Sequence, residues 1–175
     1  MAFSNPVEIV EQFNLIEGMT VADFGSGSGA YAKALAKRVG SKGKVYAIDV
    51  QKELIHRLRR EAKSDNLHNL EIVWSDLERL GGSKLRDASV DFVLVANLLF
   101  QVASQYTLLL EAKRILKPGG HLAIIDWSDS FGGLGPPSAK VVSPNMAKEM
   151  AARAALKPVR EFPAGDHHYG LLFAL

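Results

Sequence analysis

The chain has 175 residues, no cysteine and a formal net charge of +2. The length suits one domain with a buried core, and the missing cysteines exclude disulfides, thiolate metal sites and thiol nucleophiles. The small net charge gives no strong nucleic-acid signal. The densest basic run, residues 57–60 with Lys63, lies beside acidic residues on a predicted helix. We interpret it as a solvated face rather than a binding patch.

Composition and hydropathy also indicate the class of protein and the compartment in which it works. Hydrophobic residues make up 47% and charged residues 23% of the chain, which is ordinary for a globular protein and excludes disorder as the main state. No apolar run approaches the ~18 residues of a membrane-spanning helix. Residues 1–6 do not have the pattern of a leader peptide and are expected to run straight into a helix. We therefore expect a single cytoplasmic domain over residues 1–175, without membrane insertion.

The chain begins with a predicted amphipathic helix. Asn5 suits the N-cap and Pro6 the first helical position. Apolar residues then recur at helical spacing up to Gly18, at Ile9, Val10, Phe13 and Ile16. Residues 19–24 form a short apolar run, which predicts a buried strand. A Gly/Ser turn and a helix-forming run over residues 30–37 follow it.

The turn after this strand, Asp23-Phe24-Gly25-Ser26-Gly27-Ser28-Gly29, fits two templates. Gly25-x-Gly27-x-x-Ala30 satisfies the dinucleotide fingerprint, and Asp23-x-Gly25-x-Gly27-x-Gly29 resembles the first motif of class I S-adenosylmethionine-dependent methyltransferases. A plain glycine-rich turn is the third interpretation. Glycine accepts positive φ and lets a ligand approach the backbone, and the helix start that follows has unpaired amides. The stretch therefore predicts a site for a nucleotide-like ligand.

A second strand is predicted over residues 44–50, and a helix over residues 51–62. Asp49 falls at the carboxyl end of this strand, roughly twenty residues past the glycine motif, where an acid can accept a hydrogen bond from a ribose hydroxyl. The alternative is an N-cap for the following helix. Residues 70–74 predict a third strand, followed by Ser75-Asp76-Leu77, which again places an acid at a strand end.

The remaining elements alternate in the same way. They are a loop with one helical turn (79–88), a strand (90–96) with its exit loop (97–101), a helix (104–116), a turn at Pro118-Gly119-Gly120, a strand (121–127), a Gly/Pro/Ser-rich loop (128–143), a helix to Leu156, and two strands (159–163 and 169–175). Alternating strands and crossovers predict an open, mostly parallel sheet with helices on both faces. Ligands of such sheets bind beyond the carboxyl ends of the strands.

With these residues placed, the chain resembles class I S-adenosylmethionine-dependent methyltransferases, in particular the small-molecule group that includes the ubiquinone/menaquinone-type and arsenite enzymes. The resemblance rests on residues 23–29, Asp49, residues 75–77 and the Leu-Lys-Pro-Gly-Gly stretch at 116–120. It implies an α/β, Rossmann-like fold with a seven-stranded, mostly parallel sheet and a C-terminal antiparallel strand pair. A nicotinamide enzyme would explain the glycines and Asp49 but neither residues 116–120 nor the terminal pair.

The resemblance also implies which residues bind the cofactor. The glycine loop faces the methionine part, Asp49 at the end of the second strand holds the ribose, Asp76 and Leu77 meet the adenine, and Ala96 and Asn97 lie near the amino acid portion. The expected set is Asp23, Phe24, Gly25, Ser26, Gly27, Gly29, Asp49, Val50, Asp76, Leu77, Ala96 and Asn97.

Three departures from the family narrow the acceptor. Residues 97–100 read Asn-Leu-Leu-Phe, not the Asn/Asp-Pro-Pro-Tyr/Phe signature of methyltransferases that modify exocyclic amines of bases or glutamine. Arsenite-type members depend on cysteines, which this chain lacks. The segment before Val21 is short and leaves little material for a substrate lid.

Methyl transfer from a sulfonium is an in-line displacement that needs alignment more than acid or base catalysis. A base helps only where the acceptor must lose a proton. The candidates are His167 and His168, next to Asp166, and Asp126 at the end of the 121–127 strand. For the histidines a structural loop and a metal site are the alternatives, but neighbours on a strand point to opposite faces, so we expect no metal. For Asp126 the alternative is capping the loop that follows.

The sequence thus predicts a methyltransferase for a small, apolar or aromatic acceptor, acting as a monomer or homodimer. Two alternatives stay open. One is a methyltransferase for a macromolecule, protein or RNA; the other is a protein that binds S-adenosylmethionine or NAD without transferase activity.

Overall fold

The computed structural model describes residues 5–175. Its helices are α1 (Pro6–Glu11), α2 (Ala30–Val39), α3 (Lys52–Ser64), α4 (Gln105–Ile115), α5 (Pro144–Arg153) and a short 3₁₀ helix, η1 (Ser138–Lys140). Its strands are β1 (Thr20–Phe24), β2 (Lys44–Asp49), β3 (Leu70–Trp74), β4 (Val90–Ala96), β5 (Leu116–Trp127), β6 (Lys157–Pro163) and β7 (His168–Ala174). The expectation of a chain that starts without a leader falls largely on residues 1–4, outside the described part.

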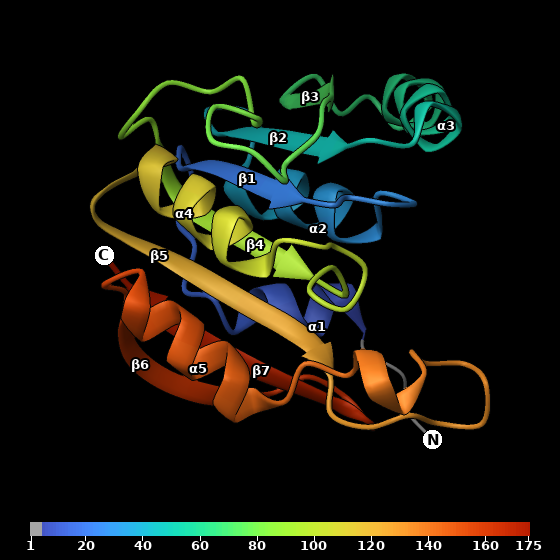
Figure 1. Cartoon of the computed structure of the whole chain (residues 1–175). Helices are drawn as coiled ribbons and strands as arrows, with labels where there is room; N and C mark the ends of the chain where they lie inside the picture. The colour runs from blue at the N-terminus through green and yellow to red at the C-terminus, as the bar shows by residue number, and fades with distance from the viewer. Residues whose placement is uncertain (1–4) are drawn as a thin grey trace.

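The strands form one seven-stranded sheet in the order β3-β2-β1-β4-β5-β7-β6 (Figure 1). The first five strands pair in parallel, whereas β7 pairs antiparallel with both β5 and β6. The predicted fold class is therefore confirmed, including the C-terminal antiparallel pair. Within residues 5–175 the structure has no helix with the length and apolar character needed to cross a bilayer.

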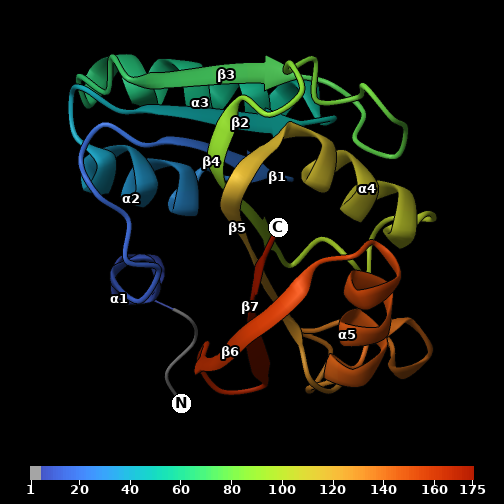
Figure 2. The same cartoon turned by 90° about the vertical axis from the view of Figure 1, so that its left-hand side faces the viewer.

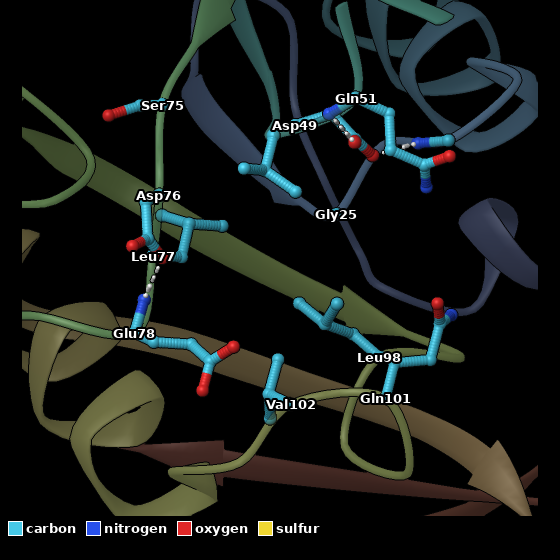
Figure 3. A pocket seen from close by; sticks show the side chains of 12 residues that line it. Gly25, Asp49, Gln51, Ser75, Asp76, Leu77, Glu78, Leu98, Gln101 and Val102 are labelled. Atoms are coloured by element: carbon cyan, nitrogen blue, oxygen red, sulfur yellow. Dashed lines mark hydrogen bonds between the residues drawn. The ribbon is translucent and has the colours of Figure 1, made fainter.

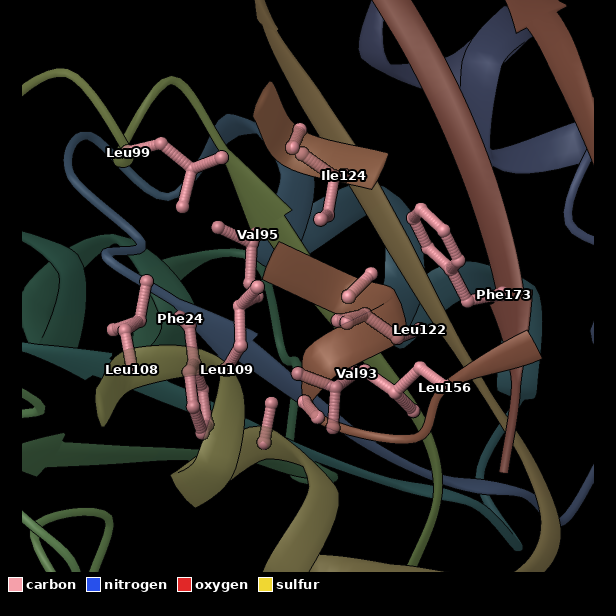
Figure 4. Packing of buried hydrophobic residues seen from close by; sticks show 14 of the residues in the cluster. Phe24, Val93, Val95, Leu99, Leu108, Leu109, Leu122, Ile124, Leu156 and Phe173 are labelled. Carbon is pink, nitrogen blue, oxygen red and sulfur yellow. The ribbon is translucent and has the colours of Figure 1, made fainter. Parts of the chain in front are cut away.

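The two faces of the sheet carry separate hydrophobic layers. Figure 2 shows α1 and α2 on one side of the sheet and α4 and α5 on the other. Helix α3 packs through Leu58 and Ala62 into the same layer as α1 and α2. Strand β4 supplies both layers by alternation, because Phe92 and Leu94 pack with α1 and α2 while Val93 and Val95 pack with α4 and α5. Figure 4 shows the second layer, with Leu108 and Leu109 of α4 near Val95. This two-sided burial explains why the strands read as continuous apolar runs.

Helix α1 is shorter than its apolar spacing predicts. It begins at Pro6 after the Asn5 cap, whose side chain accepts a hydrogen bond from the Val7 amide, but it ends at Glu11. Asn14 then adopts a left-handed φ of 54°, which turns the chain out of the helix, and Ile16 is exposed rather than buried. Phe13 still anchors this segment, stacked 4.9 Å from the Phe92 ring.

Strand β5 starts earlier than predicted. Val90 pairs with Leu116 and Phe92 with His121, so the residues between them on β5 form a bulge inside the strand rather than a turn before it. Gly119, with φ of 78°, supplies the left-handed position that this bulge needs. The other boundaries shift less, with α5 ending at Arg153 instead of Leu156 and β6 starting at Lys157 instead of Val159.

The crossover from β3 to β4, residues 75–89, contains turns but no helix. The single helical turn that we expected within residues 79–88 does not form. A buried acid on α4 holds it in place. Glu111, fully buried, accepts hydrogen bonds from the amides of Gly81 (2.7 Å) and Ser83 (2.9 Å) and from the Ser83 hydroxyl. Arg114 pairs with Glu111 and with Asp87 and donates to the Leu85 carbonyl. This network replaces the packing that a crossover helix would provide.

Candidate functional site

The glycine loop connects the end of β1 to α2 at the carboxyl edge of the sheet. Gly25, Gly27 and Gly29 have φ of 70°, 52° and 81°, a region that favours glycine. The amides of Gly25 and Ser26 donate to the Ile48 carbonyl at 2.9 and 3.0 Å, which fixes the loop against β2. Helix α2 starts at Ala30 without a side-chain cap, because its N-cap residue is Gly29, and the Ala32 amide of its first turn donates to Asp23.

Gly29 faces α3 rather than the site. A Cβ on Gly29 would lie 2.2 Å from Leu58 Cδ1, and Leu58 is fully buried. We expect Gly29→Ala to lower the free energy of unfolding by about 2 kcal/mol or more, because left-handed strain and a core clash add together. Gly27→Ala is the matched control, since a Cβ there meets nothing closer than 3.9 Å. Equal losses in urea denaturation of the two variants would contradict this explanation.

Asp49, at the end of β2, ties the glycine loop to α3. It is 6% exposed, and its Oδ2 accepts a hydrogen bond from the Gly27 amide while its Oδ1 accepts one from the Gln51 amide, both at 2.8 Å. Gln51, not Asp49, occupies the N-cap of α3, so the alternative that Asp49 caps this helix is wrong. Its carboxylate instead borders a pocket.

The first pocket has a volume of about 190 Å³ and lies between the ends of β1, β2 and β3 and the loop after β4 (Figure 3). Of the predicted residues, it is lined by Gly25, Gly27, Asp49, Val50, Asp76 and Leu77. Asp76 Oδ1 accepts a hydrogen bond from the Glu78 amide at 2.9 Å. Glu78 Oε2 in turn accepts from the amides of Ala103 and Ser104, which joins the wall of the pocket to the start of α4.

A second pocket, of about 330 Å³, lies on the other side of the glycine loop. The predicted residues Asp23, Ser26, Ala96 and Asn97 line it, together with Gly25 and Gly27. Two acceptor atoms there, Asp23 Oδ2 and Asn97 Oδ1, are buried without a hydrogen-bond partner among residues 5–175. Burial and the nearby Asp49 carboxylate raise the pKa of Asp23 to about 7. A hydrogen bond from the Ala32 amide acts in the opposite direction and lowers this pKa.

Two residues of the expected cofactor set do not line either pocket. Phe24 is fully buried in the layer under α4 and α5, so only its backbone belongs to the glycine loop. Gly29 faces Leu58 as described above. Sequence reasoning also missed several lining residues, namely Gln51, Ser75, Glu78, Leu98, Gln101 and Val102. Leu98 and Gln101 follow Asn97 in the exit loop of β4, and the strand-end rule that selected Asn97 also pointed to that loop.

The three candidate catalytic residues lie at the ends of β5 and β7. Asp126 is fully buried, its Oδ2 accepts from the Leu99 amide (2.9 Å) and its Oδ1 from its neighbour Trp127 (2.8 Å). Burial raises its pKa to about 6, although these amides oppose the shift. Both oxygens therefore hold backbone, and Asp126 fixes the loop after β4.

The two histidines point to different partners. His167 Nδ1 lies 2.9 Å from both carboxylate oxygens of Asp129, and its ring stacks on Phe131 at 3.9 Å. His168 Nδ1 lies 3.0 Å from the Asp166 carbonyl, and its ring packs 4.3 Å from Trp127. Neither histidine lines the two pockets described above. The described residues contain no cluster of three or more acidic or histidine side chains able to hold a metal ion.

The two pockets together fit S-adenosylmethionine. They share Gly25, Gly27 and Gln101, so a ligand can extend from one into the other across the glycine loop. The buried oxygens of Asp23 and Asn97 suit a cation such as the ammonium of the methionine portion. The Asp23 carboxylate is 1% exposed and its Oδ2 has no hydrogen-bond partner among residues 5–175, so it would gain much from an opposite charge. The side with Asp49 and Asp76 suits the adenosine portion.

Comparisons with known proteins agree with this geometry. The profile of the methyltransferase domain family matches residues 22–124, more than half of the 175 residues. The crystal structure of a SAM-dependent methyltransferase from Aquifex aeolicus has a TM-score of 0.89 and 34% identity, with 98% of this chain and 90% of that chain covered.

Two curated relatives are similar over part of their length. The ubiquinone/menaquinone biosynthesis C-methyltransferase UbiE of Bordetella avium is 34% identical over 66% of this chain and 43% of that protein. The demethylmenaquinone methyltransferase of Geobacillus stearothermophilus is 28% identical over 69% of this chain and 50% of that protein. The aligned part is thus half or less of either relative. With the family match, the sheet order and the paired pockets, the chain belongs to the methyltransferase domain family, among the class I S-adenosylmethionine-dependent methyltransferases.

Proposed function

We propose that this domain transfers a methyl group from S-adenosylmethionine to a small-molecule acceptor, and that residues 1–175 act as one cofactor-binding unit. The observation that carries the proposal is the meeting of the two pockets at Gly25, Gly27 and Gln101, beside the buried Asp23 carboxylate, whose Oδ2 has no hydrogen-bond partner among residues 5–175. The names of two relatives, which refer to demethylmenaquinone and to ubiquinone/menaquinone biosynthesis, support a small-molecule acceptor.

In this proposal, different residues of the chain bind different portions of the cofactor. Asp23 and Asn97 hold the ammonium, Asp49 accepts from the ribose, and Asp76 with Leu77 borders the adenine. Gly27, where a Cβ would meet nothing closer than 3.9 Å, leaves room for the ligand between the two pockets. When bound, the cofactor supplies an already activated methyl group, so the work of the protein is alignment and exclusion of water.

That one of the three candidate residues accepts a proton stays a prediction, but their contacts change the order in which we rank them. Asp126 uses both carboxylate oxygens on backbone amides, so we propose that it positions residues 97–101. His167 is the better base, because Asp129 holds Nδ1 and leaves Nε2 for a proton. Strand β7 lies two strand spacings from β4, about 10 Å.

Cofactor binding is tested by thermal unfolding with S-adenosylhomocysteine and, separately, NAD. A ligand at about 100 times its dissociation constant adds ~2.7 kcal/mol to the stability of the folded state. We expect a rise in melting temperature with S-adenosylhomocysteine, its loss in Asp49→Ala, and none with NAD.

Asp65→Ala is the matched control, because the Asp65 carboxylate lies at the far end of α3, 3.7 Å from Lys33 Nζ, and lines neither pocket. A shift with NAD alone would replace the proposed function with a nicotinamide-binding one. Binding without turnover of any acceptor would favour a non-catalytic role, and salt-dependent RNA binding a macromolecular acceptor.

A further inference from the structure

A third pocket opens beside the two cofactor pockets, on the side of the sheet that carries α4 and α5. It has a volume of about 340 Å³ and lies between the segment that leads into α4 and the segment that joins η1 to the start of α5. That volume is within the range of small-molecule sites. Its walls include the apolar side chains of Phe100, Val102, Val141, Val142 and Met146, while polar atoms make up about half of its surface.

Gln101 is the residue where the three pockets meet. It lines the adenosine-side pocket, the methionine-side pocket and the third pocket, and no other residue lines all three. Its Nε2 donates to the Asn97 carbonyl at 2.6 Å, which holds the side chain over the exit loop of β4. Figure 3 shows Leu98 and Gln101 on this loop, and the Leu98 side chain reaches Gly25, where a Cβ would lie 2.8 Å from Leu98 Cδ1. Since the sulfur joins the adenosine and methionine portions, the shared wall of the first two pockets is where the methyl group belongs.

The charge of the third pocket is one-sided. Lys140 is its one charged lining residue, and no carboxylate or imidazole lines it. Among residues 5–175, Lys140 has no acidic partner within 4.0 Å. A cavity with several apolar side chains on its walls and one ammonium without an acidic partner at its rim fits a ligand that has an apolar part and one anionic group.

We propose that this pocket is the acceptor site, and that the acceptor is an apolar or aromatic molecule with one acidic substituent. The inference rests on the proposed function, because it places the acceptor beside the cofactor at Gln101. In the bound acceptor the acidic group lies at Lys140 and the methylated atom faces Gln101. Phe100 and Val102 on one wall and Met146 on the other contact the apolar part of the acceptor.

The test uses 8-anilino-1-naphthalenesulfonate, an aromatic anion, as the probe. We expect saturable fluorescence enhancement with the wild-type protein and about tenfold or more weaker binding to Ala139→Trp, which fills the pocket from an exposed position. Ser138→Trp is the matched control, an exposed neighbour on η1 that does not line the pocket. Met146→Trp, at a position 51% exposed, is the second filling variant if Ala139→Trp does not fold.

Charge and position are tested separately. Lys140→Gln should weaken binding of the anionic probe by about two- to fivefold and leave binding of the uncharged dye Nile red unchanged. Interligand nuclear Overhauser effects between bound S-adenosylhomocysteine and the probe should appear in the wild type and vanish in Ala139→Trp.

Three results would overturn the proposal: no saturable probe binding, equal binding to the filling variants and to Ser138→Trp, or no interligand effect. In each of these cases, stabilisation by S-adenosylhomocysteine would leave the proposed function standing. A different outcome is also defined. If the wild type binds the probe and Ala139→Trp does not, but the wild type does not bind S-adenosylhomocysteine, both the proposed function and the acceptor assignment are wrong.

Discussion

Replacing Glu111 with alanine is expected to lower the free energy of unfolding by about 3–5 kcal/mol, the usual cost of breaking a buried ion pair from one side. Glu111 is fully buried and is the acceptor for Arg114, for the Ser83 hydroxyl and for two amides of the crossover. Its removal leaves the Arg114 guanidinium and those amides without their acceptor. For a chain of this size, each kcal/mol lowers the melting temperature by about 2–4 °C, so differential scanning calorimetry should detect the change easily.

Acid should reproduce part of this loss. Burial acts to raise the pKa of Glu111, but the hydrogen bonds from Arg114 and Ser83 outweigh it and lower the pKa from 4.5 to about 2. A depressed pKa means that the stabilisation is present above the unfolded pKa, near 4.5, and is lost as the pH falls toward 2. Stability measured between pH 5 and pH 2 should therefore fall more steeply in the wild type than in Glu111→Gln.

Exposed Glu149→Ala, on α5, is the matched control for removal of one carboxylate. A loss in Glu111→Ala no larger than in this control would show that the crossover is held by other contacts.

The prediction from sequence succeeded where the pattern was local. Apolar runs located the strands, and the strand-end rule placed Asp49, Asp76 and Asn97 on one edge of the sheet, where each lines a pocket. Glu111 could not be found in this way, because an acid within a helix reads as part of its exposed face. Its burial depends on turns some thirty residues earlier in the chain, and no spacing rule links those turns to α4.

Prediction of the site from the sequence had the same limit. Residue types at the ends of strands identify candidate carboxylates and amides, but the direction of each side chain decides which groups it contacts. Its place at a strand end makes Asp126 a candidate base, yet its carboxylate oxygens accept hydrogen bonds from the Leu99 and Trp127 amides. Gln101 has no motif of its own, and its place at the junction of the pockets follows from the path of the loop after β4.

Replacing Asp23 with asparagine is expected to stabilise the ligand-free protein and to weaken its binding of S-adenosylhomocysteine. In the free protein the carboxyl group is buried, one of its oxygens has no partner among residues 5–175, and its pKa is raised from 3.8 to about 7. Ionised Asp23 therefore costs folding energy, by up to about 4 kcal/mol at pH 8. Asparagine keeps the shape and removes that charge.

The sign of the pH dependence follows from the raised pKa. The contribution of Asp23 to stability is fully present below its unfolded pKa, near 3.8, and is lost as the pH rises through about 7. The gain from Asp23→Asn should therefore be largest near pH 8 and disappear near pH 4. Urea denaturation of both proteins at several pH values measures it.

Binding should change in the opposite direction. An ionised Asp23 facing the ammonium of the ligand forms a charge-assisted contact, and its loss costs about 1.5–3 kcal/mol, or roughly 10- to 100-fold in affinity. Because the ligand needs the ionised form, wild-type affinity should fall below pH 7 and binding near neutral pH should release protons. Calorimetry in buffers of different ionisation enthalpy measures that release, which Asp23→Asn should abolish.

Two controls separate this role from general effects. Asp65→Asn makes the same change in net charge at an exposed position away from both pockets, and should leave affinity and proton release unchanged. Adenosine lacks the ammonium, so its binding should release no protons. If Asp23→Asn binds S-adenosylhomocysteine as tightly as the wild type, the buried carboxylate does not face the cation. Greater stability together with weaker binding would mean that β1 keeps an unfavourable buried charge because the cofactor requires it.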